Sequence, residues 1–185
     1  MRPGGSLWVV NADGSTLRRL TDPPFIACLP ATSPRSPLVA FTGSVDGGAT
    51  FQIYVIGLDG TGLRRLSPAG TEFDYRPNWS PDGGSLVFLN SPTNGQLYRG
   101  LWTMRTDGTQ RTQILPGAPS WDSPAWSPDG RYVILHTCTD DLNQVTSCRI
   151  FKVRRDGTGL TQLTFAPPGH FDSNADWQPI LEGDN

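Results

Sequence analysis

The stretches PNWSPDGGSLVF, residues 77–88, and PAWSPDGRYVIL, residues 124–135, follow one pattern and lie 47 positions apart in the chain. Each predicts the end of one β-strand, a tight turn at Asp-Gly and a second, apolar strand. Because the pattern occurs twice in a chain of 185 residues, the unit that folds is a repeat of about this length.

A second signal, Asp-Gly followed by Ser or Thr, marks the same period four times. The aspartates are Asp13, Asp59, Asp107 and Asp156, at intervals of 46, 48 and 49 residues. Runs rich in apolar residues precede each copy, and a glycine takes the positive φ of a tight hairpin turn without steric cost. Each Asp-Gly is therefore predicted to join two strands.

Each repeat is predicted to hold four short strands. The first ends at Trp-Ser-Pro, the second is apolar throughout, the third carries an aromatic residue at its second position, and the fourth follows Asp-Gly. A weaker copy of the first element begins at Ala31, and a last partial copy, ADWQPI, begins at Ala175. No segment has a sustained apolar period of 3.6 residues, so we expect essentially no helix.

Repeats of about 40–50 residues with four strands each are typical of β-propeller blades. The sequence thus predicts an all-β fold, a β-propeller of four-stranded antiparallel blades. The inner-strand tryptophans should stack between blades, where burying one indole contributes roughly 4–6 kcal/mol as an upper figure. The arginine pairs at 18–19 and 64–65 fall on the outer edge strand, where charge discourages edge-to-edge pairing. The residues predicted to be structural are Trp79, Trp126 and Trp177 between blades, and Asp82, Gly83, Asp129 and Gly130 in the turns.

About four blade equivalents can be counted in the chain. We expect residues 1–185 to form one propeller or half-propeller domain, with a partial blade at 1–27, blades at about 28–70, 71–118 and 119–166, and a closing strand at 175–181. Two chains joined head to tail would complete an eight-blade ring, so a homodimer is expected. The alternative is that the chain is a fragment of a longer propeller.

Composition excludes several classes of partner. A formal net charge of -2 provides no basic field for nucleic acid. No apolar run is long enough to cross a membrane as a helix, so no membrane insertion is expected. The start, MRPGGSLWVV, lacks the layout of a signal peptide, which indicates either a cytosolic protein or a chain that begins inside a longer precursor.

The repeat SPAWSPDGRYVIL, with its later CRIFKVRRDGTGLTQLT, resembles the repeat of the TolB-type β-propellers. The resemblance covers nearly the whole chain. It implies a binding role and an extracytoplasmic or periplasmic location, or the gating propeller of a prolyl-oligopeptidase-like enzyme. TolB-type propellers usually have six or more blades, whereas this chain has about four blade equivalents and so departs from the family in blade number.

No catalytic motif is found in the sequence: Gly-x-Ser-x-Gly, phosphate-binding glycine loops and HExxH are all absent. The two histidines, His136 and His170, fall on different blades, whereas a metal site needs several convergent ligands. We therefore expect no enzyme activity, no cofactor and no metal.

Three aspartates precede the inner-strand tryptophans by four or five residues, and each follows an aromatic residue. This register places them in the loops that lead into the inner strands, on one face near the central channel. Gathered there, they could attract a cation or a basic peptide and raise one another's pKa. Alternatively, each aspartate accepts backbone N–H bonds and stabilises its own loop. The predicted binding set is Phe73, Asp74, Tyr75, Trp121, Asp122, His170, Phe171 and Asp172.

Cys138 and Cys148 flank the loop between the second and third strands of one repeat, with nine residues between them. They could face each other across a hairpin, and a disulfide there would contribute roughly 3 kcal/mol and indicate an oxidising compartment. The alternative is two buried free thiols.

The function predicted first is a non-catalytic TolB-like scaffold that binds a protein or peptide through loops on one face, since such loops on a rigid scaffold usually carry binding. Two alternatives stay open. The chain could be the propeller portion of a larger hydrolase or lyase whose catalytic residues lie elsewhere, or a purely structural ring-forming fragment.

Overall fold

The computed structural model describes residues 5–68, 73–91, 98–119, 121–141, 144–165, 167 and 169–178, and within these ranges it contains strands and turns but no α-helix. The strands in chain order are β1 (Trp8–Val9), β2 (Arg18–Arg19), β3 (Ile26–Thr32), β4 (Leu38–Ser44), β5 (Gln52–Gly57), β6 (Arg64–Arg65), β7 (Phe73–Trp79), β8 (Ser85–Ser91), β9 (Tyr98–Arg105), β10 (Thr112–Pro119), β11 (Asp122–Trp126), β12 (Tyr132–Asp141), β13 (Gln144–Arg154) and β14 (Thr161–Gln162).

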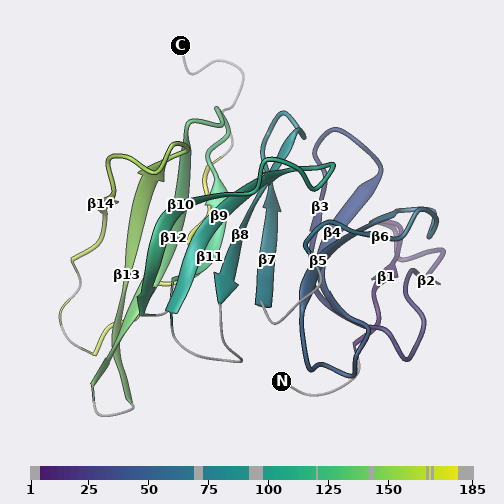
Figure 1. Ribbon diagram of the computed structural model, residues 1–185, viewed down its shortest axis with the longest axis horizontal. Helices are drawn as coiled ribbons and strands as arrows, with labels where there is room; N and C mark the ends of the chain where they lie inside the picture. The colour runs from purple at the N-terminus through teal and green to yellow at the C-terminus, as the bar shows by residue number, and fades with distance from the viewer. Residues whose placement is uncertain are drawn as a thin grey trace.

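Strands that follow one another in sequence pair antiparallel and form three four-stranded sheets, β3–β6, β7–β10 and β11–β14, and one two-stranded sheet, β1–β2. The sheets follow one another from the β1–β2 hairpin at one end to β14 at the other (Figure 1). The predicted fold class, an all-β propeller built of four-stranded antiparallel blades, is confirmed. We call each sheet a blade.

The hydrophobic core lies between the blades. One cluster joins the β1–β2 hairpin to the β3–β6 blade, a second joins that blade to β7–β10, and a third joins β7–β10 to β11–β14. The second strand of each four-stranded blade contributes to them with almost no exposed surface, as Phe41, Phe88 and Leu135 show. Because both faces of such a strand are covered, each carries an apolar run, at Leu38–Phe41, Leu86–Leu89 and Tyr132–Leu135.

Two of the inner-strand tryptophans form a hydrogen bond with the blade that precedes their own. The indole N–H of Trp79 donates to the carbonyl of Ala31 at 2.9 Å, and that of Trp177 donates to the carbonyl of Ala125 at 3.2 Å. Trp126 is just as buried as Trp79, but its indole N–H makes no hydrogen bond among the described residues. Instead, its backbone N–H donates to the side chain of Asn78 at 3.3 Å.

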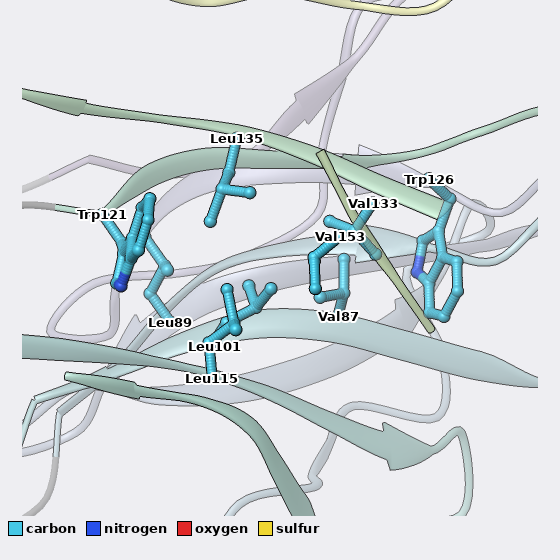
Figure 2. Packing of buried hydrophobic residues seen from close by; sticks show 9 residues of the cluster. All are labelled: Val87, Leu89, Leu101, Leu115, Trp121, Trp126, Val133, Leu135 and Val153. Atoms are coloured by element: carbon cyan, nitrogen blue, oxygen red, sulfur yellow. The ribbon is translucent and has the colours of Figure 1, made fainter. Parts of the chain in front are cut away.

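Trp121 lies in the loop between β10 and β11, as expected, but its side chain is part of the core. Its side chain is buried, its ring meets Phe151 edge-on at 5.4 Å between centroids, and its indole N–H donates to the carbonyl of Pro116 at 3.3 Å. Figure 2 shows it at one end of the cluster between the last two blades, with Trp126 at the other end. The sequence indicates the loop, but the burial of a loop side chain depends on the neighbouring blade, here β7–β10.

The Ser-Pro-Asp-Gly turns form local hydrogen-bond clusters. Ser127 donates to the carboxylate of Asp129 at 2.5 Å, and that carboxylate also accepts the backbone N–H of Arg131 at 3.0 Å. Gly83 and Gly130 have positive φ angles of 72° and 68°. Each also lies against the turn of the preceding blade: a Cβ on Gly83 would come within 2.9 Å of the Arg35 side chain.

The arginines of the outer strands also form hydrogen bonds with the next blade. The guanidinium of Arg18 donates to the carbonyls of Leu58 and Asp59, and that of Arg64 donates to the carbonyl of Thr106 at 2.8 Å. Each acceptor lies at the Asp-Gly turn of the next blade. These side chains therefore connect neighbouring blades at the outer rim.

Residues 175–178 of the predicted closing strand belong to no sheet, and residues 179–181 lie outside the described ranges. Within the described chain no strand lies where it could pair with 175–178. Trp177 nevertheless docks on the preceding blade as an inner-strand tryptophan does.

Because Trp79 and Trp126 differ in their hydrogen bonds, the same substitution is predicted to lower the free energy of unfolding by different amounts. Both Trp→Phe changes remove similar volume, but only Trp79→Phe leaves the Ala31 carbonyl without the indole donor. We expect Trp79→Phe to lower the free energy of unfolding by about 1 kcal/mol more than Trp126→Phe. Urea melts of the two variants measure this difference, and equal losses would contradict the role given to the Trp79 hydrogen bond.

The turn carboxylates predict a loss of stability in acid. The Ser127 hydroxyl, followed by the Arg131 N–H, holds the pKa of Asp129 below its ordinary value, and Ser80 does the same for Asp82. A carboxyl with a lowered pKa in the folded state contributes stability above its ordinary pKa, and this is lost as the pH falls through that range, between about pH 5 and 2. Asp129→Asn should reduce the acid-induced drop in unfolding free energy, and Ser127→Ala should reduce it too. A pH series of melts in which both variants keep the full drop would contradict this.

Candidate functional site

The inner strands surround an open hollow of about 290 Å³. β3, β7, β11 and the segment that follows residue 172 each contribute three consecutive residues to its wall. The lining residues are Leu29, Pro30, Ala31, Arg76, Pro77, Asn78, Ser123, Pro124, Ala125, Asn174, Ala175 and Asp176. The hollow is therefore the start of a central channel, built from equivalent positions of four repeats.

The backbone takes the same unusual conformation at the first of these positions in every repeat. Leu29, Arg76, Ser123 and Asn174 have positive φ angles of 53°, 52°, 47° and 53°. In β3, β7 and β11 the ladder register also shifts at this point, as in a β-bulge. A left-handed conformation costs a residue with a side chain about 1–2 kcal/mol. Four such residues around one hollow are a repeated feature of the site.

Proline follows the left-handed residue in three of the four copies, at Pro30, Pro77 and Pro124. Proline has no N–H, so the channel-facing edge of these strands cannot donate a ladder hydrogen bond at this point. This helps to keep the hollow clear of further strands, since an unprotected edge pairs readily with another chain.

A hydrogen-bond network at the hollow joins the inner strands β7 and β11 to the segment around Asn174 and to β12. Arg76 forms an ion pair with Asp122, 2.5 Å between Nε and Oδ1, and its Nη1 lies 3.4 Å from the hydroxyl of Ser123. Ser123 donates to the side-chain carbonyl of Asn174 at 2.8 Å. The backbone N–H of Asn174 lies 3.4 Å from Nδ1 of His136. Burial lowers the pKa of His136, which favours the neutral ring that can accept this N–H.

Asp74 does not lie in a loop or at the open mouth of the hollow, as the sequence predicted. It is part of β7 and is buried, with its carboxylate 2.8 Å from Nη2 of Arg111 and 2.9 Å from the side-chain amide of Asn90. Burial, not a neighbouring carboxylate, raises the pKa of Asp74, while hydrogen bonds from Ser67 and Asn90 and the charge of Arg111 oppose the rise. The Arg111 guanidinium also lies over the ring of Trp102, 4.5 Å from its centroid.

The aromatic neighbours of Asp74 are also covered. Phe73 and Tyr75 are buried, stack on each other with ring centroids 5.9 Å apart, and form a small cluster with Phe51. The structure thus places Phe73, Asp74 and Tyr75 between blades, and of the predicted aspartates it brings Asp122 to the network of the hollow.

The third predicted group, His170, Phe171 and Asp172, lies beside Cys148 in the middle of β13. The backbone N–H of Cys148 donates to the carbonyl of His170, and the N–H of Asp172 donates to the carbonyl of Cys148, both at 3.2 Å. Cys148 forms a disulfide with Cys138, its partner across the β12–β13 ladder. Phe171 is exposed, and one carboxylate oxygen of Asp172 is buried without a hydrogen bond from any described residue.

The sequence analysis did not identify the four left-handed residues. Leu29, Arg76, Ser123 and Asn174 share no chemistry, so no motif of side chains links them. The available signal was positional: they lie at intervals of 47, 47 and 51 residues, and three of them precede a proline.

Among the described residues, no three histidine, cysteine, aspartate or glutamate side chains come close enough to hold a metal ion together. A search of the same ranges for a helix able to span a membrane also finds none.

The comparisons with known proteins agree on one family. The family model described as the TolB beta propeller domain matches residues 3–181. An uncharacterized protein of Agrobacterium fabrum is 28% identical over 132 residues, which cover 71% of this chain and 41% of the relative. The Tol-Pal system protein TolB of Geobacter sulfurreducens is 34% identical over 83 residues, 45% of this chain and 18% of the relative. The solved structure of a putative TolB from Agrobacterium tumefaciens superposes with a TM-score of 0.74 at 25% identity, over 93% of this chain and 61% of that one.

The chain therefore spans less than two thirds of each of these relatives. Similarity also extends to an enzyme: an uncharacterized peptidase, YuxL, of Bacillus subtilis is 27% identical over 103 residues, 49% of this chain and 15% of the peptidase.

The ion pairs Arg111–Asp74 and Arg76–Asp122 differ in exposure, so replacing the arginine by methionine is predicted to lower the free energy of unfolding by different amounts. The Arg111–Asp74 pair is nearly enclosed, with exposed fractions of 17% and 2%, whereas the Arg76–Asp122 pair is partly open at 37% and 22%. Arg111→Met leaves a buried carboxylate without its counter-charge and should cost about 3–5 kcal/mol, while Arg76→Met should cost about 1 kcal/mol or less. Denaturant melts compare the two, and a larger loss for Arg76→Met would overturn the assignment.

Proposed function

This chain belongs to the TolB beta propeller family, and from that membership and the hollow between its inner strands we propose that it is a non-catalytic scaffold that binds a segment of a protein partner. The observation that carries the proposal is the repeated left-handed residue. One backbone geometry presents four different side chains, from Leu29, Arg76, Ser123 and Asn174, around a single depression. Strained residues kept by the surrounding structure are frequent at binding sites.

The chemistry of the wall suits a polypeptide. Apolar, cationic, hydroxyl, amide and carboxylate groups line it, the carboxylate from Asp176, and its prolines and alanines add short apolar surfaces. The charge of Arg76 is balanced by Asp122, so the hollow has no positive field that would select a nucleic acid. An extended peptide offers carbonyls to Arg76 and to the Asn174 amide.

Two further observations support a protein partner outside the cytoplasm. The Geobacter relative is by its name a protein of the Tol-Pal system. The Cys138–Cys148 disulfide is typical of oxidising compartments. Loops on one face of the propeller stay candidates for additional contacts. The eight-blade homodimeric ring stays a prediction, because the comparisons do not address how many chains assemble.

A second candidate function is the propeller portion of a larger hydrolase. The similarity to the Bacillus peptidase favours it, and this chain corresponds to only a small part of that protein. In that case peptides would pass through the hollow to reach catalytic residues in another domain. Sequencing the genomic reading frame on both sides of these 185 codons separates the two candidates, because a hydrolase domain joined to the repeats would favour the second.

The proposal predicts that a bulky side chain in the hollow abolishes peptide binding. Ser123→Arg fills the depression at a position whose backbone already accepts arginine in another repeat, Arg76. Peptides selected from a phage-displayed random library on the wild-type chain should bind Ser123→Arg at least tenfold more weakly, as measured by isothermal titration calorimetry. Leu17→Arg adds the same charge at an exposed site away from the hollow and should bind as wild type does.

Two results would contradict the binding function. One is that no peptide is enriched above the empty support, which would favour the purely structural alternative. The other is that the selected peptides bind wild type and Ser123→Arg equally, which would place binding elsewhere on the chain.

A further inference from the structure

A cleft of about 250 Å³ lies between the β7–β10 and β11–β14 blades, next to the Asp-Gly turn that follows β13. The β7–β10 blade contributes Ser85, Thr103 and Arg105 to its wall, and the opposite blade contributes Trp126 and Arg155. None of these residues lines the central hollow, so the cleft is a separate feature of the molecule. Its volume is well above the roughly 30 Å³ that one water molecule occupies in the liquid, which leaves room for a small organic molecule.

Apolar side chains occupy the same positions at the preceding interface, between the β3–β6 and β7–β10 blades. The ladder registers place Ser85 and Thr103 where the β3–β6 blade has Leu38 and Val55. Both of these apolar residues belong to the cluster that joins that blade to Trp79 of the next one. In the cleft, hydroxyl groups replace this apolar wall, and the serine leaves space that a leucine would fill.

The outer rim of this interface has a threonine in place of the arginine that connects the earlier blades. Thr112 stands at the position of Arg18 and Arg64, whose guanidinium groups donate to carbonyls of the following blade. The acceptor of Arg64 is the carbonyl of Thr106, and the equivalent residue one repeat later is Arg155. A threonine side chain is too short to form this bridge, so the cleft stays open at the rim.

The residues of the cleft wall have hydrogen-bond donors to spare. Among the described residues, the hydroxyls of Ser85 and Thr103 form no hydrogen bond, and the guanidinium groups of Arg105 and Arg155 form no ion pair. The buried indole N–H of Trp126 has no acceptor in this part of the chain either. Arg155 lies over the Trp126 ring, 5.8 Å from its centroid, so this guanidinium is held at the cleft. A wall rich in unused donors fits a ligand rich in oxygen acceptors.

The carboxylates near the cleft are engaged by their own turns. Asp156, which lines the cleft, accepts the backbone N–H and the hydroxyl of Thr158 at 2.9 and 2.7 Å. Asp82 accepts the hydroxyl of Ser80 at 2.6 Å, and this hydroxyl, more than the charge of Arg155, lowers the pKa of Asp82. These carboxylates reduce the net charge at the cleft but leave the arginine N–H donors unused, so directed hydrogen bonds decide which ligand fits.

We propose that this cleft binds a small hydroxylated organic anion, a sugar that carries a carboxylate or a phosphate group. A guanidinium group binds either anion through paired N–H donors, and Arg105 and Arg155 offer one such group on each wall. The hydroxyls of Ser85 and Thr103 both donate and accept, as the hydroxyls of a sugar require. A ligand held between the two walls stabilises the folded chain, because it binds only where both blades are in place.

Ligand-observed NMR titrations of the 185-residue chain with glucuronate, glucose 6-phosphate and glucose test the proposal. At least one of the two anions should bind with a Kd at least tenfold lower than that of glucose, and the better anion identifies the group that the arginines bind. That anion should also raise the melting temperature. Arg155→Gln should raise its Kd at least tenfold. Arg154→Gln is the matched control, because Arg154 is the adjacent exposed arginine and does not line the cleft, and it should bind as wild type does.

A variant that copies the preceding interface separates a lost site from a damaged fold. Ser85→Leu combined with Thr103→Val should weaken binding of the anion at least tenfold, while the melting temperature without ligand stays at or above that of wild type. Ser123→Arg, in the hollow, should bind the anion as wild type does, so this site and the proposed peptide site fail independently. Four results would each overturn the proposal: no binding of either anion, equal binding of glucose, equal losses for Arg155→Gln and Arg154→Gln, or full binding by the double variant.

Discussion

The contact between one blade and the next is the interaction on which the rest of this structure depends. No blade encloses a core of its own: the clusters lie between sheets, and the indoles of Trp79 and Trp177 donate to carbonyls of the preceding blade. At the outer rim, Arg18 and Arg64 reach forward to the next Asp-Gly turn. Stability in such a molecule is a sum of nearest-neighbour interfaces, as in other repeat proteins.

The same constraint explains the candidate binding site. Inner strands that converge on a common axis must bend, and a bulge with one left-handed residue bends each of them at an equivalent position. The bend turns that residue toward the axis, and the repeat thereby delivers a ring of side chains to one hollow. Packing requires the backbone geometry and leaves the identity of the side chain free, so the residues that differ from blade to blade are those that face the hollow.

Aspartates at different positions of the repeat have different partners. The turn aspartates accept hydrogen bonds from their own turns, and Asp74 is enclosed with Arg111 between two blades. Asp122 directly precedes the left-handed Ser123, so it occupies the position of Tyr75 one repeat later, and it pairs with Arg76 at the hollow.

The sequence by itself determined the all-β class, the four-strand repeat, the Asp-Gly hairpins and the apolar second strands, because turn chemistry and strand alternation are local and recur with the period. It also indicated that Trp79 and Trp126 lie between blades. Only the tertiary structure decided that Trp121 is in the core, that Asp74 is paired with a buried Arg111 from the outer part of its blade, and that Leu29, Arg76, Ser123 and Asn174 meet at one hollow. Those facts depend on which surfaces the neighbouring blades cover, and that information lies in contacts between residues tens of positions apart.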